Sequence, residues 1–146
     1  MADLQSIRFA FYKITTDEFA LTEEKYDPAE NAEMNVGVGF NFIREEKVII
    51  AQIKCMFYQQ GRLLIVITVS CWFKIVPEDW DKIYQEENKT FDLSRAPALH
   101  LASLTLGTAR GVLHAKTEKH ILNAVLIPPV YLHEIIKEDV KVSVRE

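Results

Sequence analysis

The chain has 146 residues, of which 49% are hydrophobic and 26% charged, and its formal net charge is -4 at pH 7. These values are typical of one globular domain over residues 1–146, large enough to bury about two thirds of its unfolded surface. An acidic chain without a basic cluster is not expected to bind nucleic acid. Its start lacks the basic and apolar regions of a signal peptide, and its apolar runs are too short to span a bilayer. We therefore expect a cytoplasmic protein without direct membrane insertion.

The first predicted element is a strand. Ile7, Phe9 and Phe11 alternate with polar or small neighbours, and the alternation fades near Thr15 and Thr16. The stretch 17–33 is acidic and contains Pro28, which predicts a long irregular connection, and long ordered loops are often functional.

Residues 35–76 are almost unbroken strand-forming sequence. The row Val36, Val38, Phe40 and Phe42 alternates with Asn35, Gly37, Gly39 and Asn41. Glycines at strand spacing predict that another backbone approaches closely there.

Two further strands carry apolar residues at odd positions, from Ile49 to Phe57 and from Leu63 to Ile75. These rows must share one face, and a two-residue turn at Gln60-Gly61 would place them on opposite faces. We therefore predict a three-residue loop, 59–61, that pairs Phe57 with Leu63 and gives Gly61 a positive φ. In that register Cys55 and Cys71 lie about 20 Å apart, beyond disulfide reach, and both are expected to be buried hydrophobes.

The even positions of these two strands form a mixed polar and apolar face. The rest of the chain is sufficient to cover only one side of such a sheet. The odd, apolar side is best covered by the chain's own helix, which leaves the mixed face as an assembly or partner surface. Its proposed contact residues are Gln52, Met56, Thr68 and Trp72.

A long helix is predicted from about Pro97, because apolar residues from Leu99 to Leu113 recur at alternating spacings of three and four. Its small residues, Ala102 and Ala109 among them, allow contact with the helix of a second subunit. The alternative is that both apolar stripes are buried within one chain. An extended segment over 121–127, a break at Pro128-Pro129 and a shorter helix over 130–138 follow, before a terminal strand or tail. The fold class is α+β, a four-stranded antiparallel sheet on which a long helix and a short C-terminal helix pack.

No residue pattern nominates an enzyme, a metal site or a cofactor. His100 and His114 share one side of the long helix but lie about 21 Å apart by the helix rise, which excludes shared metal ligation. The glycines form no phosphate-binding loop, because Gly37 and Gly39 lie within a strand that no helix follows.

The order of the elements resembles the SecB export-chaperone family. So do short motifs: Ala109-Arg110-Gly111 late in the long helix, Leu126-Ile127-Pro128-Pro129-Val130 before the last helix, and an opening strand over 9–18 that leads into acidic residues. The resemblance covers nearly the whole chain, although each motif is short.

The resemblance implies a non-catalytic chaperone that forms a homodimer or homotetramer. Family members hold unfolded, export-bound polypeptides in apolar grooves between the crossover loop, the sheet and the last helix. In this sequence the residues that would bind the polypeptide are Phe19, Tyr26, Phe40, Phe42, Tyr131 and Ile135. For each of them the alternative is ordinary packing in the core.

A translocation motor is the second partner that the resemblance implies. Asp17, Glu18, Glu23 and Glu24 would supply its contact, with a solvated acidic loop as the alternative. The sequence ends at Val144-Arg145-Glu146, without the acidic tail of the family, which puts delivery to a motor in doubt. A chaperone dedicated to one client, such as an antitoxin, is therefore an alternative, and a small apolar-ligand-binding α+β domain is another.

Overall fold

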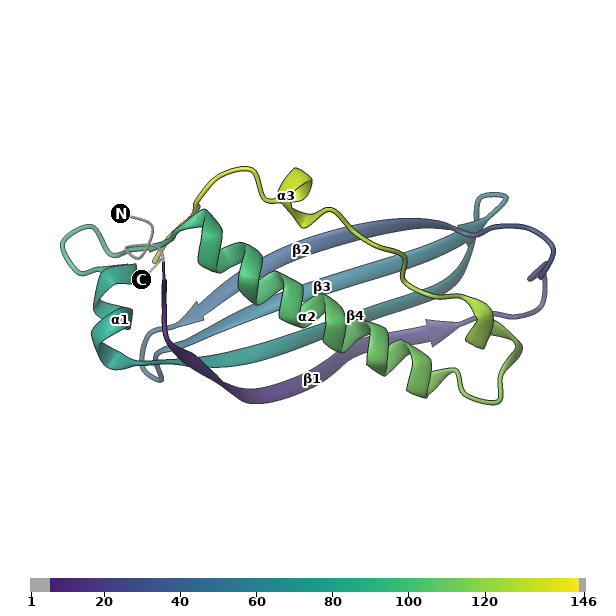
Figure 1. Cartoon of the computed structure of the whole chain (residues 1–146), viewed down its shortest axis with the longest axis horizontal. Helices are drawn as coiled ribbons and strands as arrows, with labels where there is room; N and C mark the ends of the chain where they lie inside the picture. The colour runs from purple at the N-terminus through teal and green to yellow at the C-terminus, as the bar shows by residue number, and fades with distance from the viewer. Residues whose placement is uncertain (1–5, 145–146) are drawn as a thin grey trace.

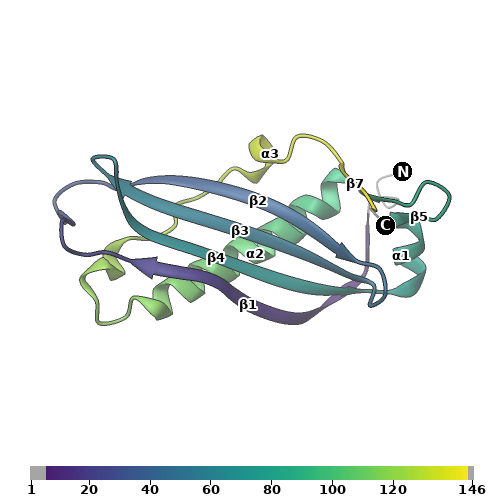
Figure 2. The same cartoon turned by 180° about the vertical axis from the view of Figure 1, so that it is seen from behind.

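A computed structural model describes residues 6–144. It confirms the α+β class, with a four-stranded antiparallel sheet in the order β1-β4-β3-β2. Figure 1 shows α2 lying obliquely across one face of this sheet, and Figure 2 shows no described segment over the opposite face. The strands and the long helix are β1 (Phe9–Leu21), β2 (Glu33–Ile43), β3 (Val48–Gln59), β4 (Arg62–Ile75) and α2 (Arg95–Lys116).

Strand β1 is longer than predicted. It runs through Thr15 and Thr16 to Leu21, because two irregularities in its register with β4, between Phe11 and Lys13 and between Thr16 and Glu18, each shift the alternation by one residue. A β-bulge of this kind hides a strand from a search for strict alternation. The crossover segment is consequently shorter, 22–32.

The hairpin between β3 and β4 corrects the predicted loop. Gln60 and Gly61 form a two-residue turn with φ of 51° and 75°, and Gln59 lies opposite Arg62. The positive φ of Gly61 is confirmed, but the extra residue is absorbed by an irregularity next to Phe57, which lies opposite Ile65 rather than Leu63. The two apolar rows therefore reach the same face by a type I′ turn and a bulge.

This register moves the two cysteines closer together than predicted. Cys55 lies opposite Ile67 and Cys71 opposite Ala51, a separation of about 13 Å along the strands. Both cysteines are free and buried. Burial raises the pKa of Cys55 to about 11, so its reactive thiolate form is scarce at neutral pH.

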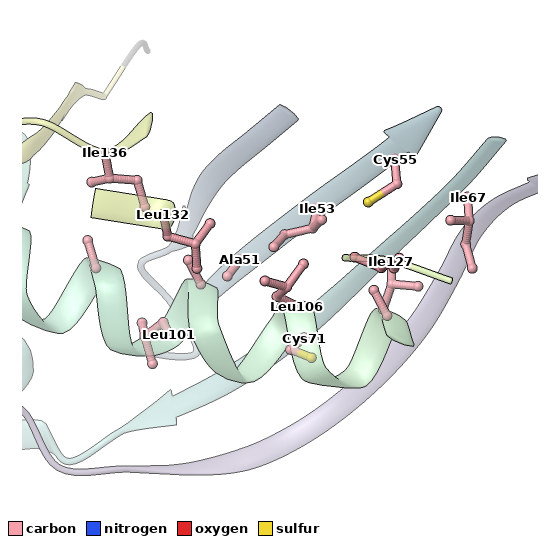
Figure 3. Close-up of a cluster of buried hydrophobic side chains, with 14 of the residues drawn as sticks. Ala51, Ile53, Cys55, Ile67, Cys71, Leu101, Leu106, Ile127, Leu132 and Ile136 are labelled. Carbon is pink, nitrogen blue, oxygen red and sulfur yellow. The ribbon is translucent and has the colours of Figure 1, made fainter. Parts of the chain in front are cut away.

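The core lies between α2 and the apolar face of the sheet, as predicted. Figure 3 shows Leu101 and Leu106 of α2 in one buried cluster with the β-strand residues Ala51, Ile53 and Cys71. Ala102 and Ala109 are only 0% and 1% exposed, so their proposed role in contact with a second subunit is corrected. They are small because α2 packs closely on the sheet of its own chain.

The C-terminal third differs most from prediction. The segment 121–127 is not uniformly extended, since it begins with the 3₁₀ helix η2 (Ile121–Ala124). The last helix, α3 (Leu132–Ile135), is only four residues long. Beyond it, β7 (Val140–Ser143) pairs with β6 (Thr90–Leu93), which pairs with β5 (Tyr84–Gln85), in a second small sheet.

An ion pair fastens the start of β1 to α1 (Pro77–Ile83). The main-chain N–H of Arg8 donates to Asp79 Oδ2 at 2.7 Å, and its Nε and Nη2 donate to the two carboxylate oxygens at 2.9 and 3.1 Å. Lys82 adds a contact at 3.4 Å. These partners hold the pKa of Asp79, which is 2% exposed, well below its usual range.

Candidate functional site

An open hollow beside the sheet lies between the crossover segment and the linker that joins η2 to α3 (residues 125–131). We call it the crossover groove. Its volume is about 650 Å³. Met34 and Phe57 contribute from the sheet, and the two walls are formed by Tyr26, Pro28, Glu30, Asn31 and Ala32 on one side and Ala124, Val125, Leu126 and Pro128 on the other.

Gln59 holds the crossover segment in place. Its side-chain oxygen accepts the N–H of Asp27 at 2.9 Å, and its Nε2 donates to the carbonyls of Asp27 and Glu30 at 2.9 and 3.0 Å. The side chain is 5% exposed and fully satisfied by these bonds. The wall formed by the crossover segment is therefore anchored at the end of β3.

Two arginines of α2 hold the opposite wall. Arg110 donates from Nε to the carbonyl of Ile127 at 3.0 Å and from Nη2 to that of Pro128 at 2.7 Å. Arg95 binds the carbonyls of Ile136 and His133 at 2.7 and 2.8 Å in the same way. The planar guanidinium fork suits two neighbouring acceptors. The linker and α3 are thus tied to α2 at both ends.

We call the linker together with α3 (residues 125–135) the tethered segment, and it carries large apolar side chains that are exposed to solvent. Leu126 and Tyr131 are each 64% exposed and Ile135 is 41% exposed. Tyr131 borders a second hollow of about 510 Å³ between α2 and residues 129–133. Exposed apolar groups that gather on one ordered segment are typical of a surface that binds another apolar chain.

The structure does not bring the predicted polypeptide-binding residues into one pocket. Tyr26 lines the crossover groove, Tyr131 and Ile135 lie on the tethered segment, and Phe40 is half-buried on β2. Phe19 lies on β1 at the opposite edge of the sheet, where Lys116 Nζ is 5.7 Å from its ring centre.

Phe42 has an internal packing role. It stacks on Phe91 with ring centres 4.7 Å apart, in a cluster that also contains Trp80 and Tyr84. This cluster joins the large sheet to the small one.

Sequence reasoning missed Leu126 and Gln59 as site residues. Leu126 belongs to an apolar run that gives no sign of which members are exposed, and Gln59 was assigned to a loop. Arg110 was noted only as part of a motif, because its acceptors are main-chain carbonyls that leave no pattern in the sequence.

A polar network occupies the centre of the mixed face. Asp17 accepts hydrogen bonds from Ser70 Oγ, from Gln52 Nε2 at 3.0 Å and from Thr15 Oγ1 at 2.9 Å. Partial burial raises the pKa of Asp17, but these bonds together outweigh that effect and hold the pKa below its usual value. The carboxylate is therefore stabilised as an anion.

The four acidic residues predicted to meet a motor separate into two places. Glu18 lies beside Asp17 on the mixed face, where Thr68 donates to it at 3.0 Å and Lys54 lies 3.3 Å away. Glu23 lies past the end of β1 and contacts His120 Nε2 at 3.1 Å, and Glu24 follows it in the crossover segment.

Within residues 6–144, no three His, Cys, Asp or Glu side chains gather so as to hold a metal ion. Over the same range, no helix has both the length and the hydropathy needed to cross a bilayer.

Comparisons with known proteins identify the fold. The SecB-like chaperone Rv1957 of Mycobacterium tuberculosis, solved in complex with a ChAD peptide from the HigA1 antitoxin Rv1956, matches with a TM-score of 0.59 and 15% sequence identity. The match covers 85% of this chain and 91% of that one. A protein of unknown function from Streptococcus agalactiae matches less well, with a TM-score of 0.43 and 11% identity over 86% of this chain and 99% of that one. No family model and no curated protein matches the sequence. The chain therefore shares the fold of a SecB-like chaperone.

Proposed function

We propose that this protein is a non-catalytic, SecB-like chaperone that binds unfolded polypeptides along the crossover groove and the tethered segment beside it. The observation that carries the proposal is the groove itself, an open trough of about 650 Å³ that is lined by both apolar and polar residues and whose two walls are each fixed by hydrogen bonds to the main chain. An open trough suits an extended chain better than a compact ligand. The shared fold with a chaperone solved in a peptide complex supports this function.

The contacts would be made by side chains that need no particular client sequence. Tyr26 and Leu126 line the groove from its two walls, and Tyr131 and Ile135 extend the apolar surface along α3. Aromatic and aliphatic groups give a large contact area for many partners. Phe40 and Phe19 are half-buried and would add contact area at the two edges of the sheet.

An aggregation assay tests the proposal. The protein should slow the aggregation of an unrelated, chemically unfolded protein when the two are present in near-equal amounts. The double variant Leu126→Ser with Tyr131→Ser should lose most of this effect while Val142→Ser, which alters an exposed residue of β7, should keep it. If the wild type fails to slow aggregation, or if all three proteins are equally active, the proposal that this groove binds unfolded polypeptides is wrong.

The identity of the client is a separate proposal. A general export chaperone would hand clients to a translocation motor, with Asp17 and Glu18 on the mixed face and Glu23 and Glu24 in the crossover segment as candidate contacts. A dedicated chaperone would serve one client, and the ChAD peptide of the M. tuberculosis protein comes from an antitoxin. Affinity purification from the native host decides between them, since one dominant companion supports the dedicated role and many companions the general one.

We also propose that the protein assembles into a homodimer or homotetramer through the mixed face. The support is that no described segment covers this face, which carries Met56 and Trp72 around the polar network. The rival function, binding of a small apolar ligand, requires neither assembly nor a peptide, and native mass spectrometry of the purified protein would show such a ligand.

A further inference from the structure

The outer edge of β2 is unpaired in the described residues. The residues that turn their main-chain N–H and C=O groups outward at this edge also turn their side chains to the apolar face, and a strand-shaped ligand needs both features. Within residues 6–144, β3 is the only strand that pairs with β2. In an antiparallel pair, alternate residues turn their main-chain N–H and C=O groups toward the partner and away from it. Which residues turn away can be derived from the register.

Odd-numbered residues of β3 bond to β4, because the Lys47 carbonyl accepts the N–H of Ile75 across that pair. Even-numbered residues of β3 therefore bond to β2, where Gln52 lies opposite Gly39 and Ile50 opposite Asn41. The N–H and C=O groups of β2 that point away from β3 thus belong to Met34, Val36, Val38, Phe40 and Phe42. The N–H of Phe42 confirms this parity, since it bonds to the side chain of Asn41 at 3.1 Å rather than to β3.

The same residues turn their side chains to the apolar face of the sheet. Val36 lies opposite Cys55 and Val38 opposite Ile53, both of which are buried beneath α2 and the linker. Directly opposed residues of antiparallel strands point to the same face. A strand added to this edge would therefore bond to β2 through the very residues whose side chains reach the apolar side.

The chain's own linker does not satisfy this edge. Figure 1 shows the linker and α3 passing on the α2 side of β2. Pro128 and Pro129 have no N–H, the carbonyls of Ile127 and Pro128 bind Arg110, and no main-chain hydrogen bond joins the linker to β2 in residues 6–144.

The edge of β2 also lacks the protection that most edge strands carry. It has no bulge, no proline and no lysine over eleven residues, whereas such features normally prevent unwanted pairing. A Cβ atom added at Gly37 or Gly39 would meet nothing within 4 Å, so the fold does not require these glycines. Strand β1, the other edge, is interrupted at two places and is a poorer template.

We propose that a client segment binds to β2 as a fifth, antiparallel strand, with its alternate apolar residues both hydrogen-bonding to Val36, Val38 and Phe40 and packing toward the linker and α3. This inference rests on the proposed chaperone function and specifies its binding mode. Main-chain bonds give affinity without sequence specificity, which suits a protein that accepts many clients.

Charge indicates the composition and the direction of the segment. The crossover segment and the start of β2 carry Glu23, Glu24, Asp27, Glu30 and Glu33 against Lys25 alone. A second copy of this chain would bring the same acidic residues, whereas a client with basic residues is complementary. An antiparallel client places its C-terminal end beside Glu33, so its basic residues are expected at that end.

The test uses a capped, fluorescent nine-residue peptide in which valine alternates with serine and two lysines close the C-terminal end. N-methylation removes an N–H and hinders strand pairing. Methyl groups on two central valines should weaken binding about thirty-fold or more, the effect of two lost hydrogen bonds, whereas methyl groups on two central serines should change it less than about threefold. A peptide with its lysines moved to the N-terminal end should bind more weakly at low salt.

A protein variant tests the same edge. Val38→Pro removes an outward N–H, which an edge strand tolerates, and should weaken binding of the peptide about fivefold or more. Val38→Ala keeps the N–H and is the matched control. If Val38→Pro does not fold, the methylated peptides still decide.

Each outcome has a defined meaning. Equal effects of the two methylation patterns would overturn strand addition while leaving the chaperone function intact, provided that aggregation is still slowed. If neither the peptide nor an unfolded protein binds, both proposals fail. Pairing of β2 with a second copy instead would show itself as a dimer that dissociates on Val38→Pro substitution without any loss of peptide affinity, and would overturn the inference as well.

Discussion

Asp79 shows how one buried carboxylate can tie two elements together. Three donors from Arg8 and a contact from Lys82 surround it, and it is only 2% exposed. An uncompensated buried charge is costly, so removal of either partner is expected to be worse than replacement of both. The sequence alone does not distinguish Asp79 from the neighbouring Glu78, because the burial of Asp79 depends on the distant Arg8.

We predict that Asp79→Asn lowers the melting temperature by several degrees at pH 7. Because the pKa of Asp79 is depressed in the folded state, its contribution is present above the unfolded pKa of about 4 and is lost as the pH falls toward the folded value. The difference between wild type and variant should therefore narrow below about pH 4. Thermal unfolding followed across this range checks the prediction, and Asp81→Asn, an exposed neighbour in α1, is the control. A gap that widens in acid would contradict it.

Gln59 is the second residue whose role depends on main-chain partners. We predict that Gln59→Met, which keeps the shape but removes three hydrogen bonds, lowers the free energy of unfolding by about 1–3 kcal/mol. Hydrogen exchange should show faster exchange of the amide of Asp27, whose N–H bonds to Gln59, and of its neighbours in the crossover segment. Gln85→Met, at an exposed position of β5 away from the crossover segment, should do neither. Unchanged exchange near Asp27 would show that Gln59 does not anchor this wall.

At the scale of elements, alternation predicted which faces are apolar but not where strands stop or how they are joined. Both errors in the sheet arise from bulges, in β1 and next to Phe57, which move a residue to the other face without any change in composition. The face of α2 that packs on the sheet was predictable from its stripe of apolar residues. The hydrogen bonds by which Arg95 and Arg110 hold the linker and α3 were not predictable, because their acceptors are main-chain carbonyls that every residue possesses.

We predict that Arg110→Met frees the linker while the sheet remains folded. Exchange of the amides over 125–127 should accelerate about tenfold, the effect of breaking one net stabilising hydrogen bond or more, and suppression of aggregation should weaken. Arg110→Lys should recover only part of the effect, since a point charge cannot bridge two carbonyls as a planar fork does.

Arg62→Met, a substitution at an exposed arginine of the β3–β4 turn, is the control and should leave the linker unchanged. Equal exchange in Arg110→Met and wild type would mean that packing alone holds the linker.

At the scale of the whole molecule, the sheet has one covered face and one open face, as the sequence predicted. The apolar face is covered by α2, whereas the mixed face has no cover from residues 6–144. The fold class and the covered face could be predicted from residue patterns. The groove could not, because it is formed by a loop, a strand end and a linker that lie far apart in the sequence.

We predict that Trp72→Asp or Met56→Asp weakens assembly more than folding. Both residues are half-buried on the mixed face, where a new charge would have to be desolvated by a partner copy. Light scattering coupled to size exclusion should show a smaller mass for these variants and an unchanged mass for Val142→Asp. A wild type that is monomeric at tens of micromolar, or folded variants of unchanged mass, would refute the assignment of this face.

The two arginine clamps have a consequence for how the protein could diversify. Since Arg95 and Arg110 grip only main-chain oxygens, the course of the segment from Ile127 to Ile136 does not depend on the side chains it displays. Tyr131 and Ile135 can therefore be exchanged without rebuilding the scaffold that presents them, and under the proposed chaperone function such exchanges would change which clients are preferred.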